Sequence, residues 1–185
     1  MRVSVTGTSG SGKTTFSENL SNALGAPHVD LDAINWQPDW YDLSKKEPEE
    51  FKRRVQQAVQ ADAWVASGNY SIVRPFILAR ATHIVWLDYP KRIVMRRVIQ
   101  RSFARAIEGH ELWPGTGNKE TFARWRDKDH PIRWAWDTYR RRRERTLAEF
   151  ADPALAHIER IRLSHPRQAQ PLIRALGQAH SSQPA

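Results

Sequence analysis

The residues best suited to chemistry lie near the start of the chain, where residues 7–14 read Gly-Thr-Ser-Gly-Ser-Gly-Lys-Thr. This segment matches the pattern G-x-x-x-x-G-K-[ST], in which backbone amides surround the phosphates of a nucleotide. Its glycines let the chain turn tightly and point several N–H groups into one concavity. We expect the segment to bind ATP; the alternative is an ordinary glycine-serine turn that caps a helix. The predicted nucleotide-binding residues are Gly7, Thr8, Ser9, Gly10, Ser11, Gly12, Lys13, Thr14 and Thr15.

Two side chains of this segment are predicted to act on the triphosphate. The ammonium group of Lys13 would reach the β- and γ-phosphates, and the hydroxyl of Thr14 would bind Mg²⁺. A helix is expected to follow, and its N-terminus favours an anion. We therefore expect ATP and Mg²⁺ as cofactors, with Lys13 catalytic and Thr14 a metal ligand.

A pair of carboxylates closes the next predicted strand, in the segment His-Val-Asp-Leu-Asp at residues 28–32. Alternation along a strand places Asp30 and Asp32 on the same side. One carboxylate could take the proton of an attacking hydroxyl, and the other could hold Mg²⁺ through water. We expect Asp32 to be catalytic and to bind the metal, and both residues to contact the substrate. The alternative is that Asp32 only caps a helix or turn.

Further polar and aromatic side chains follow the strand ends on this acceptor side. Trp36 and Trp40 could stack on a flat substrate or simply anchor their loop. Asn69 and Tyr70, after the third strand, are predicted to meet the substrate. Asp88 ends the fourth strand, where we favour a cap of the following helix.

Arginines dominate the second half of the chain. Arg97, Arg101 and Arg105 recur every four residues, so they share one face of a helix. Another cluster occupies residues 140–145, where Arg143 falls on an otherwise apolar line. Between the two helices, a segment with Pro114, Gly115 and Gly117 could hinge. A mobile lid flanked by arginines would close over a triphosphate and neutralise the charge that develops during transfer.

The net charge of +9 is concentrated in the same stretch. Residues 91–145 contain 16 Lys or Arg and 7 Asp or Glu, so all the excess lies there. Of the 29 basic residues 22 are Arg, whose planar group grips phosphate with two hydrogen bonds. One interpretation is a solvated surface. The other is an anion-binding segment, for nucleotide phosphates or for nucleic acid.

Strand and helix patterns alternate along the whole chain, which predicts an α/β fold with a parallel sheet covered on both faces. Residues 32–43 are expected to form a loop. The predicted strands are residues 2–6, 28–31, 63–66, 83–87 and 157–163. The predicted helices are residues 13–24, 47–61, 72–80, 91–107, 119–127, 131–150 and 167–176.

Length and composition fit this interpretation. A chain of 185 residues suits one domain, which we assign to residues 1–176, with a flexible tail at 177–185. The absence of cysteine excludes disulfides and fits a reducing compartment, so we expect a cytoplasmic protein. We see no signal peptide and no apolar run long enough to span a membrane.

On these residues, the chain resembles the adenylate-kinase-like group of small P-loop kinases, and more narrowly bacterial proteins labelled topology modulation proteins. The resemblance covers residues 1–175 and implies a five-stranded parallel sheet in the order 2-3-1-4-5 with a small lid at 107–130. It also implies that Arg97, Arg101 and one of Arg140 or Arg141 contact phosphates. We assign Arg97, Arg101 and Arg140 as catalytic, and Arg101 also as a nucleotide contact. Arg167 follows the last strand, where this group borders the nucleotide base.

The chain departs from adenylate kinases at two positions after the third strand. Ser67 stands where they carry an acidic residue that helps hold Mg²⁺, and Ser71 stands where they carry an arginine for the acceptor phosphate. Arg74, one helical turn further on, is the candidate replacement and is predicted to bind the substrate. The pair Asp30 and Asp32 instead resembles small-metabolite kinases of the same fold.

The sequence thus favours a phosphotransferase that moves the γ-phosphoryl group of ATP to a small hydroxyl or phosphate acceptor. One alternative is a nucleotide-regulated nucleic-acid-binding protein, suggested by the basic stretch. The sequence contains no helix-turn-helix, zinc-finger or RNA-binding signature, so we rank this function second. Another alternative is an NTPase whose turnover needs no acceptor.

Overall fold

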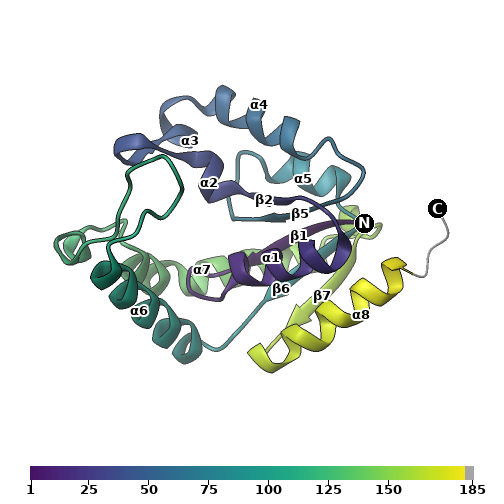
Figure 1. Cartoon of the computed structure of the whole chain (residues 1–185). Coiled ribbons are helices and arrows are strands. Elements are labelled where there is room, and N and C mark those ends of the chain that lie inside the picture. The colour runs from purple at the N-terminus through teal and green to yellow at the C-terminus, as the bar shows by residue number, and fades with distance from the viewer. Residues whose placement is uncertain (182–185) are drawn as a thin grey trace.

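The computed structural model describes residues 1–181 and forms one central sheet with helices on both faces (Figure 1). All strand pairs of this sheet are parallel. The sheet strands are β1 (Arg2–Gly7), β2 (His28–Asp30), β5 (Trp64–Ser67), β6 (His83–Leu87) and β7 (Glu159–Leu163). The helices are α1 (Lys13–Leu24), α2 (Leu31–Asn35), α3 (Leu43–Lys46), α4 (Pro48–Ala58), α5 (Arg74–Arg80), α6 (Lys91–Glu108), α7 (Pro131–Ala151) and α8 (Ala169–Ser181).

The strand order is β2-β5-β1-β6-β7. Two further strands, β3 (Trp36–Gln37) and β4 (Tyr41–Asp42), form a separate antiparallel hairpin. Counted without them, the sheet has the order 2-3-1-4-5, so the predicted α/β fold and topology are confirmed. In a parallel sheet of this kind, ligands bind outside the carboxyl ends of the strands.

Alternating side chains in the central strands divide the core into two apolar layers. Val65 and Val85 pack with α1, α6 and α8. Trp64, Ala66 and Ile84 pack on the other face with α4 and α5. Burial on both faces explains why these strands are almost continuously apolar in sequence.

Several predicted elements were wrong. Residues 32–43 are not a loop but contain most of α2, the β3–β4 hairpin and a 3₁₀ turn at Pro38–Trp40. The predicted helix at 119–127 is only a 3₁₀ turn at Phe122–Arg126. Residues 177–181 belong to α8 rather than to a flexible tail, and residues 182–185 lie outside the described residues. No helix among residues 1–181 is long and apolar enough to cross a membrane.

Candidate active site

The phosphate loop joins β1 to α1 and depends on glycine for its shape. Gly10 and Gly12 have φ angles of 85° and 92°, which side-chain-bearing residues rarely adopt. A Cβ atom at Gly10 would lie 2.7 Å from Cβ of Val98 on α6. Gly12 precedes α1 without any side-chain cap, so the first amides of that helix are open to an anion.

Lys13 folds back over this loop. Its ammonium group donates a hydrogen bond to the carbonyl oxygen of Thr8 at 3.3 Å. Burial lowers its pKa to about 8, Arg142 and Arg101 add to this effect, and Asp32 opposes it. The charges that act on Lys13 therefore come from α2, α6 and α7, which places this lysine where three elements meet.

Two groups beside the loop have no hydrogen-bond partner within the described residues. They are the buried hydroxyl of Ser11 and the buried Nε of Arg101. Thr14 and Thr15 are exposed on the first turn of α1. Open amides, unpartnered donors and an exposed threonine hydroxyl form a donor set that fits a nucleotide triphosphate with Mg²⁺.

Helix α6 places two of the predicted arginines at the loop. Arg97 donates to the carbonyl oxygen of Ser11 at 3.2 Å, and its guanidinium lies over the ring of Tyr89. Arg101 is largely buried, and this burial, together with Arg105, lowers its pKa to about 10. That both arginines contact phosphates stays a prediction.

Arg140 lies away from the site. Its side chain is 91% exposed and pairs with Glu144, one turn further along α7. Arg142 instead lines a cavity together with Gly7 and Thr8 of the phosphate loop. Burial and, after it, the charge of Arg141 lower the pKa of Arg142, while the charge of Asp32 raises it. The resemblance left Arg140 and Arg141 open as the phosphate contact. Arg141, Arg142 and Arg143 line the cavity described below and Arg140 does not, so the rotation of α7 excludes Arg140 from it.

The two carboxylates are not side by side on a strand. Asp30 ends β2 and caps α2, where its Oδ1 accepts a hydrogen bond from the backbone N–H of Asp32 at 2.9 Å. The cap is thus Asp30, not Asp32. Burial, and then Asp32, raise the pKa of Asp30 to about 6. The Asp32 side chain accepts a hydrogen bond from the Tyr70 hydroxyl at 2.7 Å, which holds one of its oxygens.

Asn69 supports the phosphate loop and also lines the cavity described below. Its amide group donates to the carbonyl oxygen of Gly7 at 2.7 Å, and its oxygen accepts from the Thr6 hydroxyl at 2.8 Å. Nearby, Ser67 is buried and pairs with His28 at 3.0 Å. The residues after β5 therefore fix the end of β1.

Arg74 is buried and already engaged. Its guanidinium forms an ion pair with Glu149 at 2.6 Å and donates to the hydroxyl of Ser4 at 3.2 Å. Because a carboxylate neutralises this guanidinium, Arg74 does not supply free positive charge for an acceptor phosphate.

The two tryptophans after α2 lie against the lid segment, residues 107–130. The ring of Trp36 stacks on Trp113 with centroids 6.3 Å apart, and Trp40 meets both edge-on. Asn118 accepts a hydrogen bond from the backbone N–H of Trp40 and donates one to the carbonyl oxygen of Gln37. The lid segment is therefore attached to the acceptor side in this structure.

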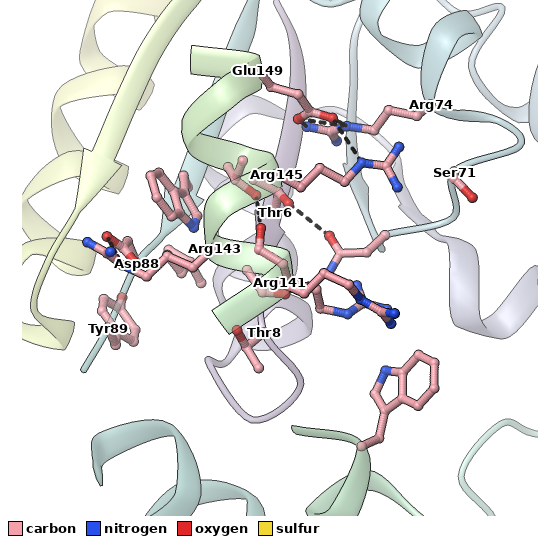
Figure 2. Close-up of a pocket in the computed structure, with 17 residues that line it drawn as sticks. Thr6, Thr8, Ser71, Arg74, Asp88, Tyr89, Arg141, Arg143, Arg145 and Glu149 are labelled. Atoms are coloured by element: carbon pink, nitrogen blue, oxygen red, sulfur yellow. Dashed lines mark hydrogen bonds and ion pairs between the residues drawn. The ribbon is translucent and has the colours of Figure 1, made fainter. Parts of the chain in front are cut away.

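A cavity of about 400 Å³ lies between the phosphate loop, the ends of β5 and β6, and α7 (Figure 2). Arg74 and Arg143, in its wall, have carboxylate partners, and Arg145 lies 4.0 Å from Glu149. The lining residues are Thr6, Gly7, Thr8, Asn69, Ser71, Arg74, Trp86, Leu87, Asp88, Tyr89, Trp134, Arg141, Arg142, Arg143, Arg145, Thr146 and Glu149. Arg141 and Arg142 form no ion pair within the described residues, and they line the cavity together with Gly7 and Thr8 of the phosphate loop.

Two remaining predicted residues lie toward β7. Asp88 does not cap α6, because that helix begins after Pro90 without a side-chain cap. It forms ion pairs with Arg143 and Arg162 instead. Arg167 is exposed in the turn after β7, and its backbone N–H bonds to the His165 ring.

Comparison with solved structures identifies shikimate kinases as similar folds. The chain superimposes on shikimate kinase from Aquifex aeolicus with a TM-score of 0.57 at 14% identity, covering 98% of each chain. The enzyme from Bacteroides thetaiotaomicron gives 0.52 at 15% identity, again covering 98% of each chain. A shikimate complex of the enzyme from Acinetobacter baumannii gives 0.48 at 20% identity, covering 96% of this chain and 88% of that one. The chain thus shares its fold with the shikimate kinases from Aquifex aeolicus and Bacteroides thetaiotaomicron.

No protein-family model and no curated protein matches the chain.

Proposed function

We propose that the protein is an ATP-dependent phosphotransferase that transfers the γ-phosphoryl group to a hydroxyl of a small acceptor. One observation carries the proposal: Lys13 begins α1 at an open phosphate loop, Arg142 lines the cavity together with Gly7 and Thr8 of that loop, and the charge of Asp32 acts on the pKa of both cations. Two cations and one carboxylate at the expected γ-phosphate position suit transfer to a group that must lose a proton.

Each side chain has a distinct task in this mechanism. The loop amides and Lys13 bind the triphosphate, while Arg97, Arg101 and Arg142 neutralise the charge that develops on the transferred group. Asp32 accepts the proton of the attacking hydroxyl through the oxygen that Tyr70 leaves free. When Mg²⁺ binds, Thr14 would hold it directly and Asp32 through water, and the ion would neutralise phosphate charge.

A hydroxyl acceptor is favoured over a phosphate acceptor. Ser71 carries no charge, and Glu149 neutralises Arg74. The acceptor subsite that we assign, the cavity of about 400 Å³, thus has free cations only at its phosphate-loop end. We keep Asp30, Trp36 and Tyr70 as predicted substrate contacts, although they do not line this cavity.

Nucleotide-regulated binding of nucleic acid is the second candidate, because several arginines of α6 and α7 point to solvent. The exposed ones are Arg92, Arg96, Arg97, Arg133, Arg140, Arg141 and Arg145. Binding of this kind would weaken steeply with salt. The likeness to topology modulation proteins, the division into one domain with a lid at 107–130, the base contact at Arg167 and a cytoplasmic location also stay predictions.

The test is ADP formation from Mg-ATP with a panel of hydroxylated and phosphorylated acceptors. We expect turnover that depends on one hydroxylated acceptor, and a loss of about 1,000-fold in Lys13→Ala, because a charge clamp of the transition state is removed. Lys46→Ala, an exposed lysine on α3, is the matched control and should be unaffected. ADP formation that no acceptor accelerates would instead indicate an NTPase. Binding of ATP no better than millimolar would contradict both.

A further inference from the structure

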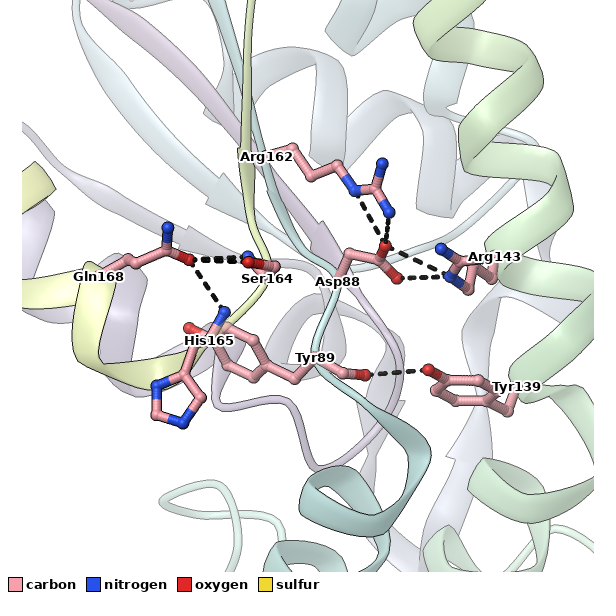
Figure 3. Close-up of polar contacts among 8 residues, drawn as sticks. All are labelled: Asp88, Tyr89, Tyr139, Arg143, Arg162, Ser164, His165 and Gln168. Carbon is pink, nitrogen blue, oxygen red and sulfur yellow. Dashed lines mark hydrogen bonds and ion pairs between the residues drawn. The ribbon is translucent and has the colours of Figure 1, made fainter.

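Asp88, at the end of β6, joins three elements through one buried carboxylate (Figure 3). Its side chain is 5% exposed and accepts hydrogen bonds from Arg143 of α7 at 3.0 Å and from Arg162 of β7 at 2.5 Å. Its backbone N–H donates to the carbonyl oxygen of Leu163 at 2.9 Å. A carboxylate buried this far is retained only with such partners, because an unpaired buried charge is strongly unfavourable.

A second contact fixes the same side of α7. The hydroxyl of Tyr139 donates to the backbone carbonyl oxygen of Tyr89 at 3.0 Å. Tyr139 and Arg143 are four residues apart and therefore share one face of the helix. Two contacts on one face, both to the segment directly after β6, define the rotation of α7 about its axis.

That rotation determines where Arg142 points. Consecutive residues of an α-helix are about 100° apart around the axis, so Arg142 lies on the face adjacent to the one held by Asp88. It lines the cavity together with Gly7 and Thr8 of the phosphate loop. Arg140, on yet another face, points to solvent.

We propose that Asp88 is a positioning residue: through Arg143 it sets the rotation of α7 and so holds Arg142 at the phosphate loop. This inference rests on the proposed function, because Arg142 is the group through which Asp88 acts on phosphoryl transfer. Asp88 does not act on the substrate directly, since its carboxylate is buried and paired with two guanidinium groups.

The chain offers a matched pair of variants. Arg143→Gln and Arg162→Gln each remove one of the two ion pairs of Asp88 and leave the other, but only Arg143 belongs to α7. We expect Arg143→Gln and Asp88→Asn to lower kcat about 30-fold and to raise KM for ATP about tenfold, since displacing a positioned group by about 1 Å has costs of this order. Arg162→Gln should lower kcat less than threefold, and so should Asp137→Asn, an exposed carboxylate of the same helix.

A double-mutant cycle distinguishes positioning from simple stabilisation. If Asp88 acts through Arg142, Asp88→Asn should have no further effect on kcat in an Arg142→Ala background. Effects of Asp88→Asn and Arg142→Ala that multiply would overturn the proposal. Equal losses of kcat in Arg143→Gln and Arg162→Gln would overturn it as well.

Binding of inorganic tripolyphosphate, measured by calorimetry, tests the same inference without any acceptor or turnover. Asp88→Asn and Arg143→Gln should weaken its binding about tenfold, and Arg162→Gln less than twofold. In the Arg142→Ala background Asp88→Asn should again change nothing. A protein that shows this pattern but no acceptor-dependent turnover would refute the proposed function alone, whereas unchanged affinity in Asp88→Asn would refute the positioning role.

Discussion

The donor and acceptor sides of the site are built in different ways. On the donor side, backbone groups of a glycine-rich loop form the binding surface, and the loop packs tightly against α6 at Gly10. On the acceptor side, side chains join segments that are distant in sequence. The Tyr70 hydroxyl donates to Asp32 of α2, and the side-chain oxygen of Asn118 accepts from the backbone N–H of Trp40. A backbone site depends on conformations that few residues permit, whereas a side-chain site depends on contacts between distant segments.

The largest effect is expected from a change of backbone on the donor side. Gly10→Ala forces a left-handed residue and places Cβ 2.7 Å from Cβ of Val98, so we expect a loss of about 4 kcal/mol in unfolding free energy and loss of ATP binding. Gly25→Ala is the control, because Gly25 is also left-handed but a Cβ atom there would have no neighbour within 4 Å. It should lose only about 1 kcal/mol. If Gly10→Ala and Gly25→Ala lost similar unfolding free energy in denaturation experiments, the distinction between the donor side and the acceptor side would not hold.

The next effect tests a side chain on the acceptor side. Asp32→Asn keeps an oxygen for the Tyr70 hydroxyl but removes the base, so acceptor-dependent kcat should fall about 300-fold while affinity for ATP changes only a few-fold. Asp39→Asn is the matched control in the neighbouring turn, since asparagine tolerates the φ of 57° found there. A parallel loss of ATP affinity in Asp32→Asn would mean that this carboxylate serves the donor side.

The pH dependence of ATP affinity should report on the donor side, and the pH dependence of stability should report on the acceptor side. Burial lowers the pKa of Lys13 to about 8, so affinity for ATP should be constant below pH 8 and fall about tenfold per pH unit above it. Burial raises the pKa of Asp30 to about 6, so the folded state binds its proton more tightly than the unfolded state. That contribution to stability is complete below about pH 4 and is lost as pH rises through 6.

Two substitutions check these assignments in binding and denaturation series across pH. Lys13→Arg should abolish the fall in affinity above pH 8, because arginine stays charged. Asp30→Asn should flatten stability between pH 4 and 6. Persistence of either dependence in its variant would assign it to another group.

The smallest effect concerns the attachment of the lid segment. Asn118→Ala removes the bonds to Trp40 and Gln37, so stability should fall by about 2 kcal/mol and KM for the acceptor should rise about threefold. Asn22→Ala, on the exposed face of α1, should change neither quantity measurably. If KM for ATP rose instead, the lid contact would belong to the donor side.

The parts of the site that sequence predicted correctly are local. Residues 7–14 form the loop at the predicted place, and α1 has the predicted bounds because Gly12 and Gly25 terminate it in left-handed conformations. Arg97 faces the loop because its helix is long and its phase is set by buried Val94 and Val98. Each of these features depends on residues a few positions apart.

The parts that sequence missed depend on contacts across the chain. Asp32 lies in a helix because Asp30 caps α2. Asn69 and Arg74 looked available, yet Gly7 and Glu149, which are 62 and 75 residues away, engage them. Asp88 likewise pairs with arginines 55 and 74 residues away. Polar residues of these types fit both a substrate and a structural partner, so their sequence position alone does not decide between the two.

The sequence by itself determined the α/β topology and the phosphate loop, because periodicity and glycine conformation act over a few residues. Only the tertiary structure decided that Arg142 rather than Arg140 faces the loop and that Glu149 neutralises Arg74. The physical reason is that consecutive residues of a helix point about 100° apart, so the four consecutive arginines of α7 are spread over all its faces. The rotation that selects among them is set by Asp88 and the carbonyl oxygen of Tyr89, about 50 residues earlier in the chain.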